Sequence, residues 1–302
     1  MILVFIMHAL FGMAFPISKM LLQYTTPIFF TALRISIAGL LLLIYQLGYA
    51  RTKFTFRRGS WLMYIQAIFF GAYITYILRF WGLAQISSSK TAFLFNTAPF
   101  FTALYAYLME KERLSRMQWT GLLLGFVGIL PILLTSSLKE KSFGELFIFS
   151  WAELAILGSV ATHCYGWMII RQLIRREGHP PVLINGIYLT IGGILALVTS
   201  LFTESIPAIA DPVYFLSWLM IVIIMSNLIS HNIYGYLLQK HYSPTFLSFT
   251  NFLGPLFAAF YGWFFLKEHI TWHFGLSTCL VLLGLYLFYR HELQVTGIRT
   301  EA

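Results

Sequence analysis

Residues 87–114 read SSSKTAFLFNTAPFFTALYAYLMEKERL, and residues 243–270 read SPTFLSFTNFLGPLFAAFYGWFFLKEHI. The two stretches align without a gap at an offset of 156 positions (243 less 87). The matched residues include Ser87 and Ser243, Pro99 and Pro255, Tyr105 and Tyr261, Lys111 and Lys267, Glu112 and Glu268 and, further on, Gly128 and Gly284. Because both copies lie in very apolar sequence, the repeat predicts two similar bundles of membrane helices.

The composition leaves too few polar residues to build a water-facing surface. Of the 302 residues, 59% are hydrophobic and 10% are charged, and the mean hydropathy is +0.77. A helix needs roughly 20 apolar residues to cross the hydrocarbon of a bilayer. Ten such runs are expected at residues 2–22, 27–48, 61–82, 91–109, 117–135, 149–170, 182–203, 214–237, 244–266 and 272–290. Runs such as Ala38–Ile44 are apolar on every side, which favours helices over the alternating strands of a membrane barrel.

Five helices in each copy make the repeat an inverted one, since the second copy then enters the membrane with the opposite orientation. The predicted fold is an all-α integral membrane protein with ten transmembrane helices in two inverted five-helix repeats. Residues 1–135 form the first repeat, 136–148 a linker, 149–290 the second repeat and 291–302 a cytoplasmic C-terminal tail. The first run is expected to be a retained helix rather than a cleaved signal, because no basic stretch precedes it.

The basic residues indicate the orientation. Cytoplasmic loops are enriched in Lys and Arg, and ten helices with both ends inside place 13 of the 20 basic residues on the cytoplasmic side. The prediction is a multi-pass protein of the cytoplasmic (inner) membrane with both termini in the cytoplasm. Arg79 counts among the outside residues in this scheme, which leaves Arg34 as the one basic residue inside a span. The basic residues behind the net charge of +9 lie mostly in the predicted loops. We therefore expect the protein to contact membrane lipids and not nucleic acid.

Polar side chains at membrane depth are costly and usually face a cavity or a partner. Asn227 and His231 are four positions apart on one face of the eighth predicted helix and form the strongest local pattern. Asn96 and Asn251 occupy adjacent positions in the two copies, each shortly before a matched proline that frees a backbone carbonyl. The predicted substrate-cavity residues are Asn227, His231, His163, Trp167, Tyr76, Asn96 and Asn251. The alternative for each is a hydrogen bond that joins two helices.

Several kinds of chemistry are not predicted. No Asp or Glu lies near the centre of a predicted span, which argues against a carboxylate proton relay. The sequence has no G-x-x-x-x-G-K-[ST] loop for ATP, and in Glu268–His273 the Glu precedes both histidines, so the H-E-x-x-H order of zinc enzymes is absent. Cys164 and Cys279 lack metal-ligand spacing and are interpreted as packing residues. We expect no catalytic residues, no cofactor and no metal.

With these residues the chain resembles the drug/metabolite transporter superfamily, and within it the EamA-type ten-helix carriers. The resemblance lies in Phe11-Gly12 to Lys19, Leu33-Arg34-Ile35, Ser87–Phe93 and Lys111-Glu112-Arg113-Leu114, and again in Ser243–Phe249, Pro255 and Lys267-Glu268. His269 and Ser277 depart from the family pattern. The resemblance covers nearly the whole chain, and it implies a monomer or homodimer whose central cavity opens alternately to each side. It also implies structural roles for Arg34 and Glu112.

The resemblance implies a secondary transporter without a cofactor rather than an enzyme. Its expected cargo is a small polar or amphipathic metabolite, with an amino acid among the candidates, and export is the commonest job in the family. Uptake or exchange is the alternative within transport, and a membrane-embedded receptor or enzyme is the alternative from another class. Arg34 and any protonated histidine would make the cavity positive, which suits a carboxylate or a zwitterion.

Overall fold

The computed structural model describes residues 2–50, 58–86, 88–137, 150–205, 209, 211–240, 242–254, 256–257 and 272–296. Several residues that the sequence analysis singled out lie outside this part of the chain: Ser87, Pro255, Tyr261, Lys267, Glu268 and His269. Most of the predicted linker, from residue 138 onward, and residues 297–302 of the predicted tail also lie outside it.

The described residues are helical where the ten apolar runs predict helices. The first copy contains α1 (Ile2–Leu21), α2 (Pro27–Leu43) with η1 (Ile44–Tyr49), the short turn η2 (Arg58–Ser60), α3 (Trp61–Gln66) with η3 (Ala67–Tyr73) and α4 (Ile74–Gln85), α5 (Ser88–Phe95), α6 (Ala98–Tyr105) with η4 (Ala106–Glu110), and α7 (Arg116–Ser137). The second copy contains α8 (Trp151–Glu177), α9 (Pro181–Thr203), α10 (Pro212–Val222) with η6 (Ile223–Ser230) and α11 (His231–Gln239), α12 (Pro244–Phe249) with η7 (Thr250–Phe252), and α14 (Trp272–Thr296).

Among the described residues, six continuous runs are long and apolar enough to cross a membrane. They are Ile2–Leu21, Pro27–Tyr49, Trp61–Gln85, Trp151–Arg175, Pro181–Thr203 and Pro212–Gln239. The predicted all-helical membrane fold is therefore confirmed.

Local sequence explains where several helices begin and end. Proline lies at the start of α2, α9, α10 and α12, where a missing N–H costs no helical hydrogen bond. Ser150 and Glu153 form a reciprocal capping box at the start of α8. That helix ends at Gly178, whose φ of 70° is a left-handed conformation that glycine adopts without strain.

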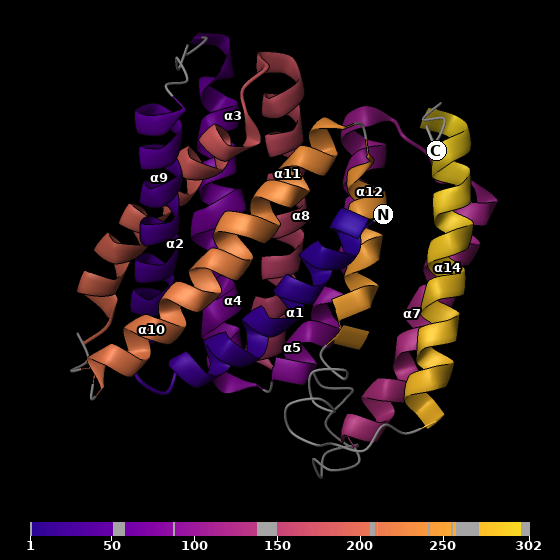
Figure 1. Ribbon diagram of the computed structural model, residues 1–302, viewed down its shortest axis with the longest axis horizontal. Coiled ribbons are helices and arrows are strands. Elements are labelled where there is room, and N and C mark those ends of the chain that lie inside the picture. The colour runs from indigo at the N-terminus through magenta and orange to yellow at the C-terminus, as the bar shows by residue number, and fades with distance from the viewer. Residues whose placement is uncertain are drawn as a thin grey trace.

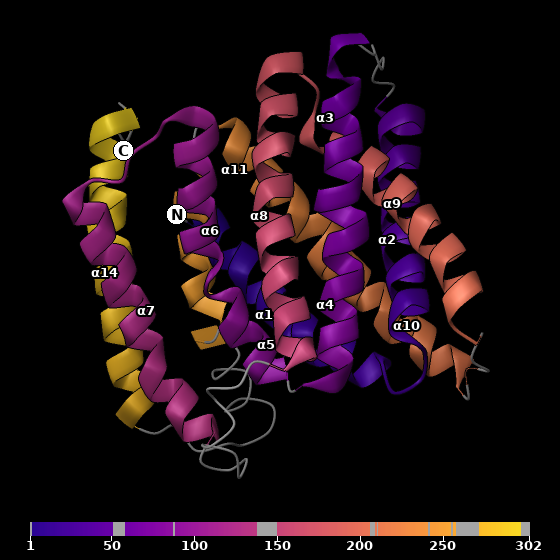
Figure 2. The same cartoon turned by 180° about the vertical axis from the view of Figure 1, so that it is seen from behind.

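The packing of the helices reflects the sequence repeat. Counterparts from the two copies lie side by side: α2 against α9, α7 against α14, and α6 against α12. The pair α2–α9 lies toward one side of the bundle and the pair α7–α14 forms its opposite edge (Figures 1 and 2). Between them, α1 packs with α10, η6 and α11 on one face, while α4 packs with α8 on the other. The bundle thus has two layers, each containing helices from both copies.

Small residues allow the counterpart helices to approach closely. A Cβ atom placed on Gly39 of α2 would lie 2.4 Å from the backbone nitrogen of Thr190 on α9. On the other side, a Cβ on Gly121 would lie 2.8 Å from the carbonyl oxygen of Gly284, and one on Gly284 would lie 2.7 Å from that of Gly121. Contacts this short exclude any larger side chain, so van der Waals packing of backbones joins the two halves at both ends.

Irregular segments occur in two matched pairs of runs. The third run has a π-helical turn at Ala67–Tyr73 and its counterpart has one at Ile223–Ser230. The fourth run is broken at Asn96 and Thr97, and the ninth tightens to a 3-10 turn at Thr250–Phe252. Broken and π-helical segments leave backbone groups outside the regular ladder and are common at functional sites in membrane bundles.

Candidate functional site

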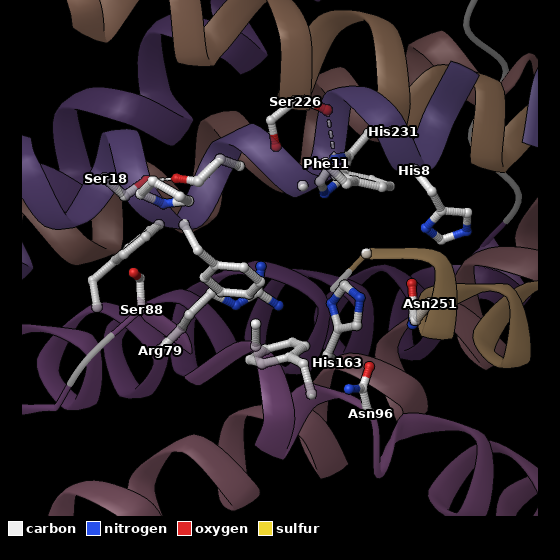
Figure 3. A pocket seen from close by; sticks show the side chains of 18 of the residues that line it. His8, Phe11, Ser18, Arg79, Ser88, Asn96, His163, Ser226, His231 and Asn251 are labelled. Carbon is white, nitrogen blue, oxygen red and sulfur yellow. Dashed lines mark hydrogen bonds between the residues drawn. The ribbon is translucent and has the colours of Figure 1, made fainter. Parts of the chain in front are cut away.

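A cavity of about 140 Å³ lies between the two layers of the bundle. Its wall comes from both copies, with residues from α1, α2, α4, α5 and the Asn96 break on one hand and from α8, η6, α11 and η7 on the other. The polar lining residues labelled in Figure 3 are His8, Ser18, Arg79, Ser88, Asn96, His163, Ser226, His231 and Asn251. Arg34 also lines the cavity. Phe11, Phe15, Phe80 and Phe95 supply the aromatic part of the wall.

Four of the seven predicted cavity residues line this cavity, namely His231, His163, Asn96 and Asn251. The other three, Tyr76, Asn227 and Trp167, do not line it but lie buried directly behind His231. The Tyr76 hydroxyl is 2.8 Å from Nε2 of His231, and the Trp167 ring centroid is 5.7 Å from the His231 ring. The structure therefore places Tyr76, Trp167 and Asn227 around His231.

For a neutral His231, the surrounding hydrogen bonds allow one arrangement of protons. Its Nδ1 lies 2.9 Å from the carbonyl oxygen of Ser226, which can only accept, so Nδ1 carries the proton. Nε2 then accepts from the Tyr76 hydroxyl, and the oxygen of that hydroxyl accepts from Nδ2 of Asn227 at 3.1 Å. His231 is thereby held as one neutral tautomer, and the eighth run is tied to the third run across the layers.

Arg34 is buried and fully engaged in the scaffold. Its Nε donates to Oδ1 of Asn227 at 2.9 Å, Nη1 donates to the Ser18 hydroxyl at 2.8 Å, and Nη2 donates to the Ser226 hydroxyl at 2.9 Å. The guanidinium thus joins α2 to α1 and to η6. This geometry agrees with the structural role that the family resemblance implied.

Arg79 corrects the sequence-based assignment of basic residues. The charge pattern predicts that it lies outside the membrane, but it lies in α4, well before the end of that helix at Gln85, and its exposed fraction is only 9%. Its guanidinium lies 4.9 Å from the ring centroid of Tyr76 and 4.5 Å from that of Phe95, and it lines the cavity. A charge close to the predicted end of a span was expected to reach water. The spacing of Tyr76 and Arg79 by three positions was the available signal that the two share an inward face.

His8 connects the two copies at the far side of the cavity. Its Nε2 lies 2.6 Å from the Thr250 hydroxyl, which itself donates to the carbonyl oxygen of Leu247 at 2.7 Å. The hydroxyl therefore accepts from His8, which links α1 to η7. At the opposite end of α1, Nζ of Lys19 donates to the carbonyls of Leu83 and Ala84 and so caps the end of α4.

A buried polar cavity between two repeated helical halves, with irregular segments in matched helices beside it, is the architecture of a membrane transporter. The profile of the EamA-like transporter family matches residues 1–134 and 150–290. The chain belongs to this family, within the drug/metabolite transporter superfamily, and is a transporter rather than an enzyme.

Individual relatives agree over nearly the whole chain. An S-adenosylmethionine/S-adenosylhomocysteine transporter of Chlamydia muridarum is 32% identical, with 97% of this chain and 92% of the relative covered. The transporter of the same description from Chlamydia trachomatis serovar L2 is 30% identical, with 99% and 91% covered. An uncharacterized transporter of Synechocystis is 26% identical over 94% of this chain and 87% of its own. A solved crystal structure with 13% identity has a TM-score of 0.74 over 97% of this chain and 96% of the other, which shows the same fold.

Proposed function

We propose that this protein transports S-adenosylmethionine and S-adenosylhomocysteine across the cytoplasmic membrane, with both termini in the cytoplasm. The observation that carries the proposal is the full-length similarity, at 32% and 30% identity, to two transporters described by these two solutes. Such a solute joins an amino acid to a nucleoside. It therefore falls within the class of small polar or amphipathic metabolites that the sequence predicts.

The lining of the cavity suits the chemical groups of such a solute. The amino-acid end has a carboxylate and an ammonium group, which need hydrogen-bonding partners in a dry site, and the cavity presents Arg79, Asn96 and His163. The adenine ring and the sulfonium of S-adenosylmethionine both favour aromatic faces, and Phe11, Phe15 and Phe80 provide apolar rings. These features support the proposal.

The size of the cavity implies movement. Its volume of about 140 Å³ is smaller than the roughly 300 Å³ of pockets that enclose drug-sized ligands. In this conformation the cavity admits the amino-acid end of such a metabolite but not the whole molecule. We therefore expect the two layers to separate further when the solute enters, as alternating access requires.

Direction follows the gradients that drive the carrier. Export remains the prediction from the sequence, and exchange of one solute for the other is the alternative. The described lining residues include no Asp or Glu, which supports a carrier driven by solute gradients rather than by protonation of a carboxylate.

Flux into proteoliposomes tests the proposal. The purified chain is reconstituted, and initial rates are measured for labelled S-adenosylmethionine, S-adenosylhomocysteine, methionine, adenosine and a panel of other amino acids, with protein-free vesicles as the control. Rates are compared with and without unlabelled solute on the opposite side. We expect both adenosyl amino acids to move faster than every other solute. Transport of ordinary amino acids with no movement of the adenosyl compounds would instead show an amino-acid carrier.

A further inference from the structure

Arg79 differs from every other described group in the cavity wall because it is a buried cation with free donors. Its side chain lies between the rings of Tyr76 and Phe95, at 4.9 and 4.5 Å from their centroids, and its Nε and Nη2 have no hydrogen-bond partner in the described part of the chain. The described lining residues contain no carboxylate to compensate it. A buried charge without a partner is costly, so its retention here calls for a partner that comes from elsewhere.

The comparison with Arg34 shows that this freedom is specific to Arg79. Both arginines are at least nine-tenths buried and both line the cavity. Each nitrogen of the Arg34 guanidinium donates one hydrogen bond, to Asn227, Ser18 or Ser226, so this side chain is anchored to the scaffold through all three nitrogens. Arg79 instead lies against two aromatic faces, and its Nε and Nη2 have no partner among the described residues.

Two more unpartnered polar atoms belong to residues of the same cavity wall. The Nδ2 of Asn96 and the Nδ1 of His163 have no hydrogen-bond partner among the described residues, and both side chains line the cavity. The His163 ring centroid is 6.1 Å from that of Phe95, and Asn96 is the next residue along the chain. Figure 3 shows Arg79, His163 and Asn96 on the same side of the cavity.

The donors and acceptors of this group match one kind of ligand end. A planar guanidinium offers parallel N–H donors that fit a carboxylate in a bidentate pair, and an amide N–H adds a further donor. A neutral imidazole nitrogen accepts from an ammonium group. An α-amino acid presents a carboxylate and an ammonium group on one carbon atom.

We propose that Arg79 binds the carboxylate of the transported solute, and that Asn96 and His163 complete a site for its α-amino-acid end. The inference rests on the proposed function and refines it: the adenosyl portion lies toward the part of the cavity between Phe11 and Asn251, and recognition begins at the carboxylate. The site then rejects nucleosides that lack the amino-acid end, since they leave the Arg79 donors unpaired.

The test compares ligands with and without the carboxylate. Binding of labelled S-adenosylhomocysteine to the purified full-length protein is competed with the unlabelled compound and with its decarboxylated analogue. The wild type should prefer the carboxylate form by about 10- to 100-fold, the range expected for hydrogen bonds to a charged group. In Arg79→Gln this ratio should fall towards one, because the decarboxylated analogue never used the guanidinium. A wild-type ratio retained in Arg79→Gln overturns the proposal.

Two further variants separate binding from folding and from general charge. Arg79→Lys keeps the charge but loses the planar fork, and should give an intermediate ratio. Arg175→Gln removes an exposed cation from the end of α8 away from the cavity and should keep the wild-type ratio. Equal loss of preference in Arg175→Gln would assign the effect to overall charge and contradict the role of Arg79.

The failure of the proposed function is distinguishable from the failure of this site. If the wild type binds no adenosyl compound, the competition is run with methionine and methioninamide, which differ at the carboxyl group alone. A preference for methionine that depends on Arg79 would then support the site while rejecting the proposed solutes. No preference for the acid in either pair would overturn the site itself.

Discussion

The two buried arginines should respond in opposite ways to removal of their charge. Arg34→Met removes three hydrogen bonds and leaves Oδ1 of Asn227 and the Ser226 hydroxyl buried without the bonds they accept from Arg34, while Ser18 keeps its bond to the carbonyl of Ala14. At about 1–3 kcal/mol for each stranded group, the expected destabilisation is about 4 kcal/mol. Arg79→Met strands no described partner and replaces an uncompensated buried cation with an apolar side chain, so stability should be unchanged or higher.

Thermal unfolding of both variants in the same detergent measures this difference. At about 2–4 °C for each kcal/mol in a chain of this size, the two melting temperatures should differ by roughly 10 °C, with Arg79→Met the higher. Arg34→Lys serves as the control that retains the charge and should fall between wild type and Arg34→Met. If Arg79→Met lowers the melting temperature as much as Arg34→Met does, then Arg79 is part of the scaffold, and the argument that its donors are reserved for a solute fails.

Three further predictions concern the scaffold. Gly39→Ala should abolish the yield of monodisperse protein in size-exclusion chromatography, because its Cβ would lie 2.4 Å from a backbone nitrogen of α9, whereas Gly48→Ala, with no atom within 4 Å, should leave the yield unchanged. Tyr76→Phe should lower the free energy of unfolding by about 1–3 kcal/mol, because His231 and Asn227 each lose a buried hydrogen bond to the hydroxyl. A double-mutant cycle with His231→Phe should show coupling between the two sites, and additive effects would contradict the hydrogen-bond network. Glu204→Gln should lower stability by about 1 kcal/mol because the carboxylate accepts from the first free N–H groups of α2; an unchanged melting temperature would show that this cap contributes nothing.

The helical runs were predictable because lipid imposes a simple requirement. Every span must be long, apolar and internally hydrogen-bonded, and the predicted runs 2–22 and 27–48 correspond to helices Ile2–Leu21 and Pro27–Tyr49. The matched prolines also indicated an interruption. Pro99 lies at the start of α6, directly after the break at Asn96 and Thr97.

The arrangement of the site was less predictable because it depends on which faces meet. Asn227 and His231 share a helix face, but their partner Tyr76 comes from the other copy, and only the packed structure shows that Asn227 bonds to Tyr76 and does not line the cavity. The π-helical turns at Ala67–Tyr73 and Ile223–Ser230 have no simple sequence signature, yet they change the register of the residues that follow. The prediction for Arg79 is wrong for a related reason. Its position near the end of a predicted span indicates contact with water, whereas the rings of Tyr76 and Phe95, from two helices, lie against its guanidinium.

Residues that match between the two copies and residues that differ have separate places in the structure. Residues that match between the copies, such as Gly128 and Gly284, pack counterpart helices against one another. Residues at the cavity differ between the copies: Arg79 has Gly235 as its counterpart 156 positions later (235 less 79). We infer that the symmetric part of the chain provides the moving scaffold and the asymmetric part provides recognition.

Exchange across a sealed membrane tests the central claim most directly. Proteoliposomes loaded with unlabelled S-adenosylhomocysteine are diluted into labelled S-adenosylmethionine, and accumulation is followed for the wild type, Arg79→Gln and protein-free vesicles. The account predicts transient accumulation of label above equilibrium with the wild type and little or none with Arg79→Gln. Equal accumulation by both proteins would contradict the assigned site, and accumulation by the wild type no greater than in protein-free vesicles would contradict the proposed transport.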